Sequence, residues 1–189
     1  CLTRSSVRCK GEKTDMTEEK KAIENALVRA AEEICLAAKT APKACGKDSI
    51  VTAILTGDEI ERLAACMDEL EKPRNKPIPI FSRDAALLRS CGAVVLIGQK
   101  RVVRALNCGL CGRKTCGGGI ADGGHCAFDD IDLGIALGSA ASIAADKRID
   151  NRILYTAGTA AMKMGLLGND VATIMALPLA AIEAALEGR

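Results

Sequence analysis

The chain has 189 residues, of which 49% are hydrophobic and 26% are charged, and its formal net charge is +2. This composition suits a domain with a buried core and excludes a disordered chain. Aromatic residues make up only 2% and no cationic stripe accompanies them, so we expect no nucleic-acid partner. No apolar run reaches the roughly 18 to 20 residues that cross a bilayer and no signal peptide is visible. We therefore expect a cytoplasmic protein without a membrane partner.

The first half of the chain alternates between helical and strand patterns. We expect residues 1–16 to form a loose N-terminal arm and residues 17–189 to form a single α/β domain. Apolar residues recur three and four apart over 17–40, which predicts a helix. The β-branched run at 50–55 predicts a buried strand. The next predicted elements are a helix at 58–71, an edge strand at 79–81 and a short helix at 82–90.

The second half continues the alternation around one unusual loop. Residues 93–98 predict a strand, and a loop rich in cysteine and glycine occupies 105–128. A long helix is expected at 129–148, and further helices at 153–164 and 179–187. Helices that alternate with fully apolar strands predict an α/β or α+β fold with a covered sheet. On one face the 129–148 helix carries a set of apolar and small residues: Ile131, Ile135, Gly138 and Ser142.

Four of the ten cysteines lie in the 105–128 loop. Cytoplasmic thiols stay reduced, so clustered cysteines there more often bind metal or carry out redox chemistry than form disulfides. Three closely spaced thiolates can bind three corners of a four-iron cube, and a fourth thiolate closes it. Glycines between them allow backbone N–H groups to face the sulfurs. The spacing C-x2-C-x4-C-x9-C places the candidate ligands at Cys108, Cys111, Cys116 and Cys126.

A structural zinc site and unligated thiols are the competing interpretations of this loop. Zinc sites with four cysteines usually contain two CxxC pairs, whereas this loop contains one, which favours a [4Fe–4S] cluster. His125, the only histidine, stands beside Cys126 and could replace a cysteine as a ligand.

The stretch NCGLCGRKTC, residues 107–116, resembles the NCGxCGxxxC opening of a four-iron cluster domain. That domain occurs in the B subunit of Rnf-type electron transport complexes and in a subunit of the acetyl-CoA decarbonylase complex. Three longer segments, AAKTAPKACGKDSI, DLGIALGSAASIAADKRIDNR and AMKMGLLG, resemble a family of bacterial and archaeal proteins described as containing a ferredoxin domain. The resemblance covers roughly residues 17–178. It implies that the four loop cysteines bind the cluster.

The order of the predicted elements is similar to that of flavin-dependent nitroreductases. This likeness implies a nitroreductase-like covered sheet with long Ala/Gly-rich helices and an inserted iron–sulfur loop. It also implies FMN as a second cofactor and a homodimer with the flavin at the interface. Arg4, Ser6 and Arg8 resemble the segment that holds the flavin phosphate, and guanidinium groups suit phosphate because they donate paired hydrogen bonds. Asn151 and Arg152 are candidates for a polar lining of the same pocket.

These patterns favour a redox protein that transfers single electrons to a partner protein that the sequence does not identify. The alternative activity is that of a nitroreductase-like FMN oxidoreductase to which the cluster supplies electrons. No pair of groups for acid–base catalysis and no nucleophilic triad is visible, which disfavours hydrolysis. The sequence thus leaves open whether the protein is an enzyme.

Overall fold

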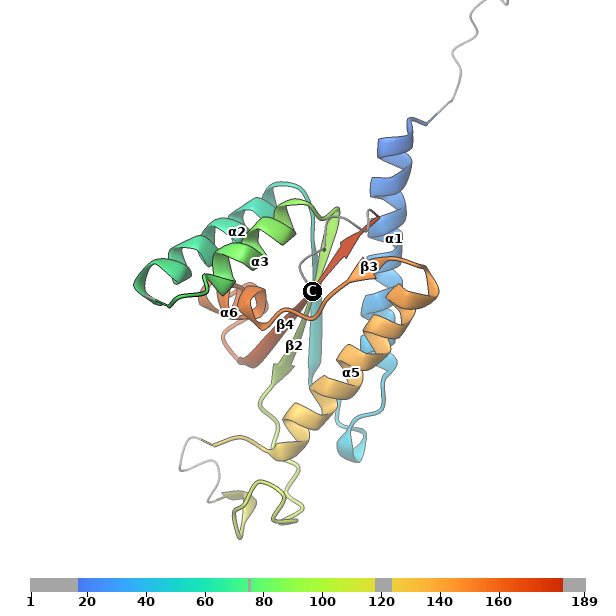
Figure 1. Cartoon of the computed structure of the whole chain (residues 1–189). Coiled ribbons are helices and arrows are strands. Elements are labelled where there is room, and N and C mark those ends of the chain that lie inside the picture. The colour runs from blue at the N-terminus through green and yellow to red at the C-terminus, as the bar shows by residue number, and fades with distance from the viewer. Residues whose placement is uncertain (1–16, 75, 118–123, 182–189) are drawn as a thin grey trace, which may run out of the picture.

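The computed structural model describes residues 17–74, 76–117 and 124–181. Its strands form a four-stranded sheet, and helices lie on both sides of this sheet (Figure 1). No helix in the described ranges is long and apolar enough to cross a membrane. In chain order the helices and strands are α1 (Glu19–Thr40), β1 (Ile50–Leu55), α2 (Asp58–Glu71), α3 (Ile80–Arg89), β2 (Ala93–Lys100), α5 (Ala127–Asp146), β3 (Asp150–Asn151), α6 (Tyr155–Lys163) and β4 (Val171–Ala180).

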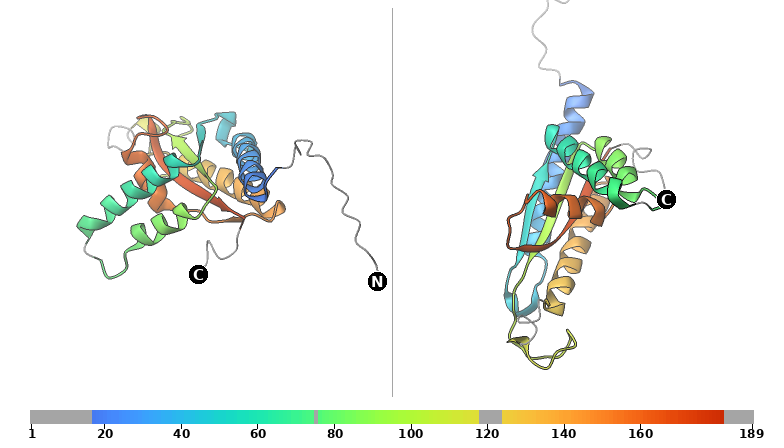
Figure 2. Two further views of the ribbon diagram at one scale, coloured as in Figure 1. Left: turned by 90° about the horizontal axis from the view of Figure 1, so that it is seen from above. Right: turned by 90° about the vertical axis from the view of Figure 1, so that its left-hand side faces the viewer.

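The sheet is antiparallel, with the strand order β1-β2-β4-β3. β2 is central, and every residue in it except Lys100 is buried. One hydrophobic cluster packs α2, α3 and α6 against one face of the sheet, and a second packs α1 and α5 against the other. Figure 2 shows the helices on the two sides of the sheet. The expected covered sheet with long helices is therefore confirmed.

Most of the predicted elements are present with small shifts of their ends, but the edge strand expected at 79–81 is wrong. Ile80 and Phe81 instead begin α3. The backbone N–H of Phe81 donates a hydrogen bond of 2.6 Å to Oε2 of Glu71, the last residue of α2. This carboxylate satisfies one of the free amides of the first turn of α3. A contact between α2 and α3 thus favours a helix at residues 80 and 81. The apolar run at 79–81 taken alone does not indicate this contact.

The helix expected at 179–187 is wrong where the structure describes it, because Leu179 and Ala180 end the strand β4. The strand β4, which contains Pro178, was not predicted from the sequence. Proline is rare inside a sheet because it cannot donate a hydrogen bond to a neighbouring strand. The backbone groups of Ala176 face the β3 side of β4, where they pair with Leu154. The nitrogen of Pro178, two residues further along, faces the same side. β3 pairs only with Leu179 and Ala180, so Pro178 interrupts no ladder hydrogen bond there.

Two helical glycines give a matched test of how closely α6 packs on the sheet. A Cβ added to Gly158 would lie 1.8 Å from the carbonyl oxygen of Ile174 in β4, whereas a Cβ added to Gly138 would meet nothing within 4 Å. We expect Gly158→Ala to lower the free energy of unfolding by about 3 kcal/mol, the upper end of the usual cost of overpacking, because backbone would have to move. Gly138→Ala should raise it by up to about 1 kcal/mol. Equal stability of the two variants in denaturant titrations would contradict this packing.

Candidate metal centre

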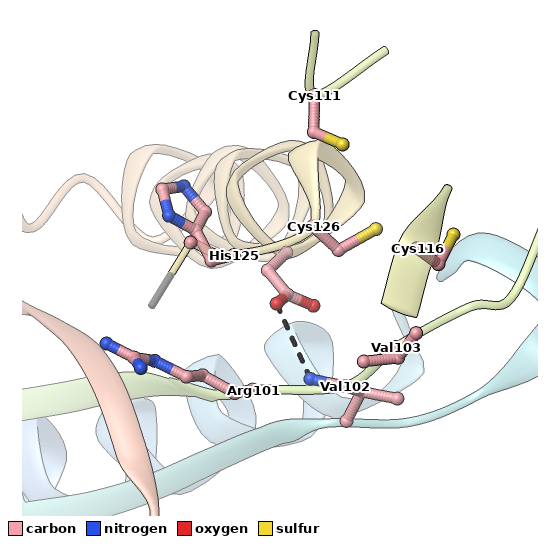
Figure 3. Close-up of a pocket in the computed structure, with 9 residues that line it drawn as sticks. Arg101, Val102, Val103, Cys111, Cys116, His125 and Cys126 are labelled. Atoms are coloured by element: carbon pink, nitrogen blue, oxygen red, sulfur yellow. Dashed lines mark hydrogen bonds between the residues drawn. The ribbon is translucent and has the colours of Figure 1, made fainter. Parts of the chain in front are cut away.

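A cavity of about 210 Å³ lies between the end of β2 and the start of α5. Three of the four predicted ligands line it, namely Cys111, Cys116 and Cys126, and their side chains surround one side of it in Figure 3. Cys108 is exposed and is not among the lining residues. The fold thus brings together thiols from two segments of the chain. The rest of the lining consists of Arg101, Val102, Val103, Gly124, His125 and Asp129.

The sulfurs around the cavity are spread more widely than the ligands of a single metal ion. Within residues 17–74, 76–117 and 124–181, no three Cys, His, Asp or Glu side chains lie close enough to bind one ion together. Thiolates around one zinc ion each lie about 2.3 Å from it. The thiolates of an iron–sulfur cube bind different iron atoms and therefore lie further apart. Three thiols that line one cavity are compatible with the wider spacing of the ligands of an iron–sulfur cube.

Two glycines shape the turn that joins the first two cysteines of the loop. Gly109 and Gly112 adopt φ angles of +77° and +76°, which glycine tolerates and most other residues do not. The N–H of Gly112 donates a hydrogen bond of 2.8 Å to the carbonyl of Gly109. This tight turn sets the positions of Cys108 and Cys111 relative to each other.

Asn107 fastens the entry of the loop to the third cysteine. Its backbone N–H donates to Sγ of Cys116 over 3.3 Å, and its Oδ1 accepts the backbone N–H of Cys116 over 2.9 Å. The residue adopts a φ of +49°, a conformation in which asparagine is enriched. Sequence reasoning did not assign Asn107 a role, although its position just before Cys108 was visible in the motif.

The two halves of the loop meet at Arg113 and Gly124. A Cβ on Gly124 would lie 2.4 Å from an Arg113 guanidinium nitrogen, so the guanidinium packs directly on the glycine backbone. The absence of a side chain at Gly124 therefore permits this contact, two residues before Cys126.

The fourth cysteine is positioned by a helix rather than by the loop. α5 begins at Ala127, two residues before the expected start, so Cys126 is its N-cap residue. The N–H of Asp129 donates to the carbonyl of Cys126 over 2.9 Å. The first amides of a helix lack partners within it and carry partial positive charge, so they can stabilise an anionic group bound at this end of α5.

A buried ion-pair network joins the loop to α5. The side chain of Arg104 is fully buried and donates to Asp132, and it forms a second ion pair of 3.4 Å with Asp129. It also donates to the carbonyl of Val102 over 3.0 Å. The N–H of Val102 in turn donates to Asp129 over 3.4 Å, the bond drawn in Figure 3. The strand end before the cysteines and the helix after them are thus held together.

Neighbouring segments extend this network. The N–H of Ala44 donates to Asp132 over 3.0 Å, and the Gln99 amide donates to Ser49 over 2.6 Å and to Asp129 over 3.3 Å. Burial raises the pKa of Asp129, although hydrogen bonding by Val102 and the charge of Arg104 act in the opposite direction. The hydrogen bond and the ion pair thus offset part of the free energy that burial of the Asp129 carboxylate costs.

Burial perturbs two thiols outside the loop, those of Cys35 and Cys91. Burial, together with the negative charge of Asp150, raises the pKa of the Cys91 thiol to about 12. Burial also raises the pKa of Cys35. A protonated thiol is a poor ligand and nucleophile, so these two cysteines are structural.

The residues predicted to hold a flavin are not gathered at this cavity. Arg4, Ser6 and Arg8 lie outside the described residues. Asn151 and Arg152 follow the far end of α5, whose 20 residues correspond to about 30 Å of helix. The amide of Asn151 donates to the carbonyl of Ile149 over 3.0 Å.

Comparison with known proteins places this geometry in a family. Residues 122–185 match a family model described as "uncharacterized protein containing a ferredoxin domain", a stretch that includes Cys126 but not the first three cysteines of the loop. An uncharacterized protein from Archaeoglobus fulgidus is 42% identical over 155 residues, which cover 77% of this chain and 81% of the relative. The chain belongs to this ferredoxin-domain family. The family resemblance read from the sequence is therefore confirmed.

Solved structures show that the ferredoxin-domain protein has a nitroreductase-like fold. A putative nitroreductase from Desulfovibrio desulfuricans, in complex with FMN, has a TM-score of 0.56 at 10% identity, with 85% of this chain and 77% of that chain covered. A nitroreductase with bound FMN from Desulfitobacterium hafniense has a TM-score of 0.56 at 14% identity, with 90% and 81% covered. A nitroreductase-like family protein from Bacillus cereus has a TM-score of 0.56 at 13% identity, with 93% and 81% covered. At such identities the likeness establishes the fold alone.

The ion-pair network of the ferredoxin-domain protein can be tested by removing its cation. Arg104→Met would leave Asp129 and Asp132 buried without their positive partner, so we expect the free energy of unfolding to fall by about 3–5 kcal/mol. Arg29→Met, at an exposed site on α1, should change it by no more than about 0.5 kcal/mol. Chemical denaturation measures both.

A companion variant keeps this test informative if Arg104→Met does not fold. Adding Asp129→Asn and Asp132→Asn to Arg104→Met removes the two charges left uncompensated and should recover part of the lost stability. A single Arg104→Met variant as stable as the wild type would contradict the role of the network.

Proposed function

We propose that this protein binds one [4Fe–4S] cluster through Cys108, Cys111, Cys116 and Cys126 and transfers single electrons in the cytoplasm. The observation that carries the proposal is that three of these thiols, from both sides of the loop, line one cavity. Membership of a ferredoxin-domain family supports a redox role.

The residues around the cavity suit such a cluster. Four thiolates around an iron–sulfur cube give an anionic assembly, which hydrogen-bond donors stabilise. The Asn107 N–H already donates to Sγ of Cys116, and Cys126 sits at the positive end of the α5 dipole. Val102 and Val103 contribute apolar walls, which limit the access of water. When bound, the cluster supplies a one-electron couple.

Each protein group has a distinct part in holding the centre. Cys126 is fixed by α5, and Cys116 is fixed by its two hydrogen bonds to Asn107. Arg104 keeps the entry and the exit of the loop at a constant separation through Asp129 and Asp132. This rigidity favours fast electron transfer, because a centre whose ligands move little needs little rearrangement when its charge changes.

Anaerobic metal analysis tests the cluster. We expect the reconstituted protein to contain about four iron and four sulfide ions per chain, with a broad absorption shoulder that bleaches on reduction by dithionite. Cys116→Ser and Cys126→Ser should lose most of the iron and sulfide. Cys45→Ser, which replaces an exposed cysteine outside the loop, should retain both. One zinc ion per chain and no sulfide would instead support a structural zinc site.

A second candidate function is that of an FMN oxidoreductase formed by two copies of the chain. Two of the structures with the same fold carry FMN. The expected face of α5 is open, since Ile131 and Ile135 are 45% and 41% exposed and Cβ atoms added to Gly134 and Gly138 would meet nothing within 4 Å. We propose that a second copy covers this face, in agreement with the homodimer expected from the sequence.

Sedimentation and absorption spectra test this second function. The wild type should sediment as a dimer at micromolar concentration, and Ile135→Asp should sediment as a monomer because a buried carboxylate is costly. The matched change Leu36→Asp, at an exposed leucine of α1, should leave the dimer intact. Bound FMN would add two resolved absorption bands to the cluster shoulder. A monomeric wild type without these bands would rule out the oxidoreductase and leave the electron carrier.

A further inference from the structure

The loop that carries the cysteines exposes large apolar side chains at one end of the molecule. Leu106 and Leu110 are 50% and 61% exposed, and Val103 is exposed as well. Figures 1 and 2 show that the loop projects from the sheet at this end. Single exposed leucines are ordinary, but several in one short stretch indicate an interaction site.

The same stretch is strongly cationic. From residue 99 to residue 117 the sequence has five basic residues and no acidic one: Lys100, Arg101, Arg104, Arg113 and Lys114. Arg104 is neutralised by Asp129 and Asp132 inside the protein, and Lys100 is paired with Asp170. Arg101 and Lys114 are exposed. Across the cavity, Asp130 is hydrogen-bonded to His125 over 2.6 Å.

Some of these apolar and cationic groups are close to the candidate ligands in the chain or share their cavity. Leu110 precedes Cys111 in the chain, so their Cα atoms are about 3.8 Å apart, and Arg101 lines the cavity with three of the thiols. A protein resting on this surface would therefore lie near the candidate ligands. Proximity is the main requirement for exchanging an electron.

We propose that Arg101, Val103, Leu106, Leu110 and Lys114, the loop surface, form a docking site for a small acidic one-electron carrier protein. This inference rests on the proposed function, since the centre in the loop must be able to hold an electron. One electron passes from the reduced centre to the oxidised carrier, and no bond or proton is transferred. The leucines supply a small apolar contact, and the cations attract a partner with acidic residues around its own redox group.

The charge of the surface predicts how the rate depends on salt and on the partner. We would reduce the reconstituted holoprotein with dithionite and mix it with either an oxidised acidic haem b cytochrome or an oxidised basic cytochrome c. With the acidic cytochrome, electron transfer should be fast at low ionic strength and slow down as salt screens the attraction. With the basic cytochrome, the rate should be lower and should not fall with salt.

Charge-reversal variants locate the effect on the loop surface. Lys114→Glu combined with Arg101→Glu should slow reduction of the acidic cytochrome by at least about tenfold at low salt, and the difference should vanish at high salt. Lys20→Glu makes a matched change at an exposed lysine in α1, distant from the loop, and should change the rate less than twofold. Leu110→Gln should slow transfer at every salt concentration, because it removes apolar contact without changing charge.

Three measurements separate failure of this inference from failure of the proposed function. Iron and sulfide analysis shows whether the wild type and each variant carry the centre. A small neutral dye should oxidise reduced Lys114→Glu protein, whose substitution lies outside the lining of the cavity, at the wild-type rate, which shows that the centre is intact. The inference is overturned if fully loaded Lys114→Glu, Arg101→Glu protein reduces the acidic cytochrome as fast as the wild type. It is also overturned if the wild type sediments as a dimer and Leu110→Gln or Lys114→Glu converts it to a monomer, because the loop surface would then bind a second copy of the chain.

Discussion

The buried ion pairs between Arg104 and the carboxylates of Asp129 and Asp132 are the constraint on which the site depends. Arg104 follows β2, and the two aspartates lie in the first turns of α5, so one side chain joins the segments on either side of the cysteines. Burying charges is costly, and it is tolerated only where the geometry satisfies them. Here the buried charges lie at the base of the loop that carries the four clustered cysteines.

The network also sets the electrostatic character of the site. One cation faces two carboxylates below the cavity, while exposed cations and leucines lie around the thiols above it. The inner side is therefore a buried network of ion pairs and hydrogen bonds, and the outer side carries exposed cations and apolar side chains. This arrangement suits a cluster that the protein binds on its inner side and that a partner protein can reach from the solvent side, as the two proposals require.

The sequence predicted the parts of the structure that local patterns determine. The ends of β1 and α2 agree with the expected residues because apolar periodicity and flanking glycine define them. β4 was not predicted. Pro178 fits into this strand because β3 pairs only with Leu179 and Ala180, and the extent of a neighbouring strand cannot be read from the local sequence. The cysteine spacing identified the loop. Arg104 and Asp132, 28 residues apart in the chain, could not be paired from the sequence, because only the tertiary fold brings them together.

Among the described residues of the segment between β2 and α5, which are 101–117 and 124–126, none belongs to either of the two hydrophobic clusters. The scaffold therefore has an apolar interior of its own, on both faces of the sheet and apart from the loop cysteines. Under the proposed function, loss of the iron would therefore leave the folded scaffold in place, and the protein could take up a new cluster without refolding.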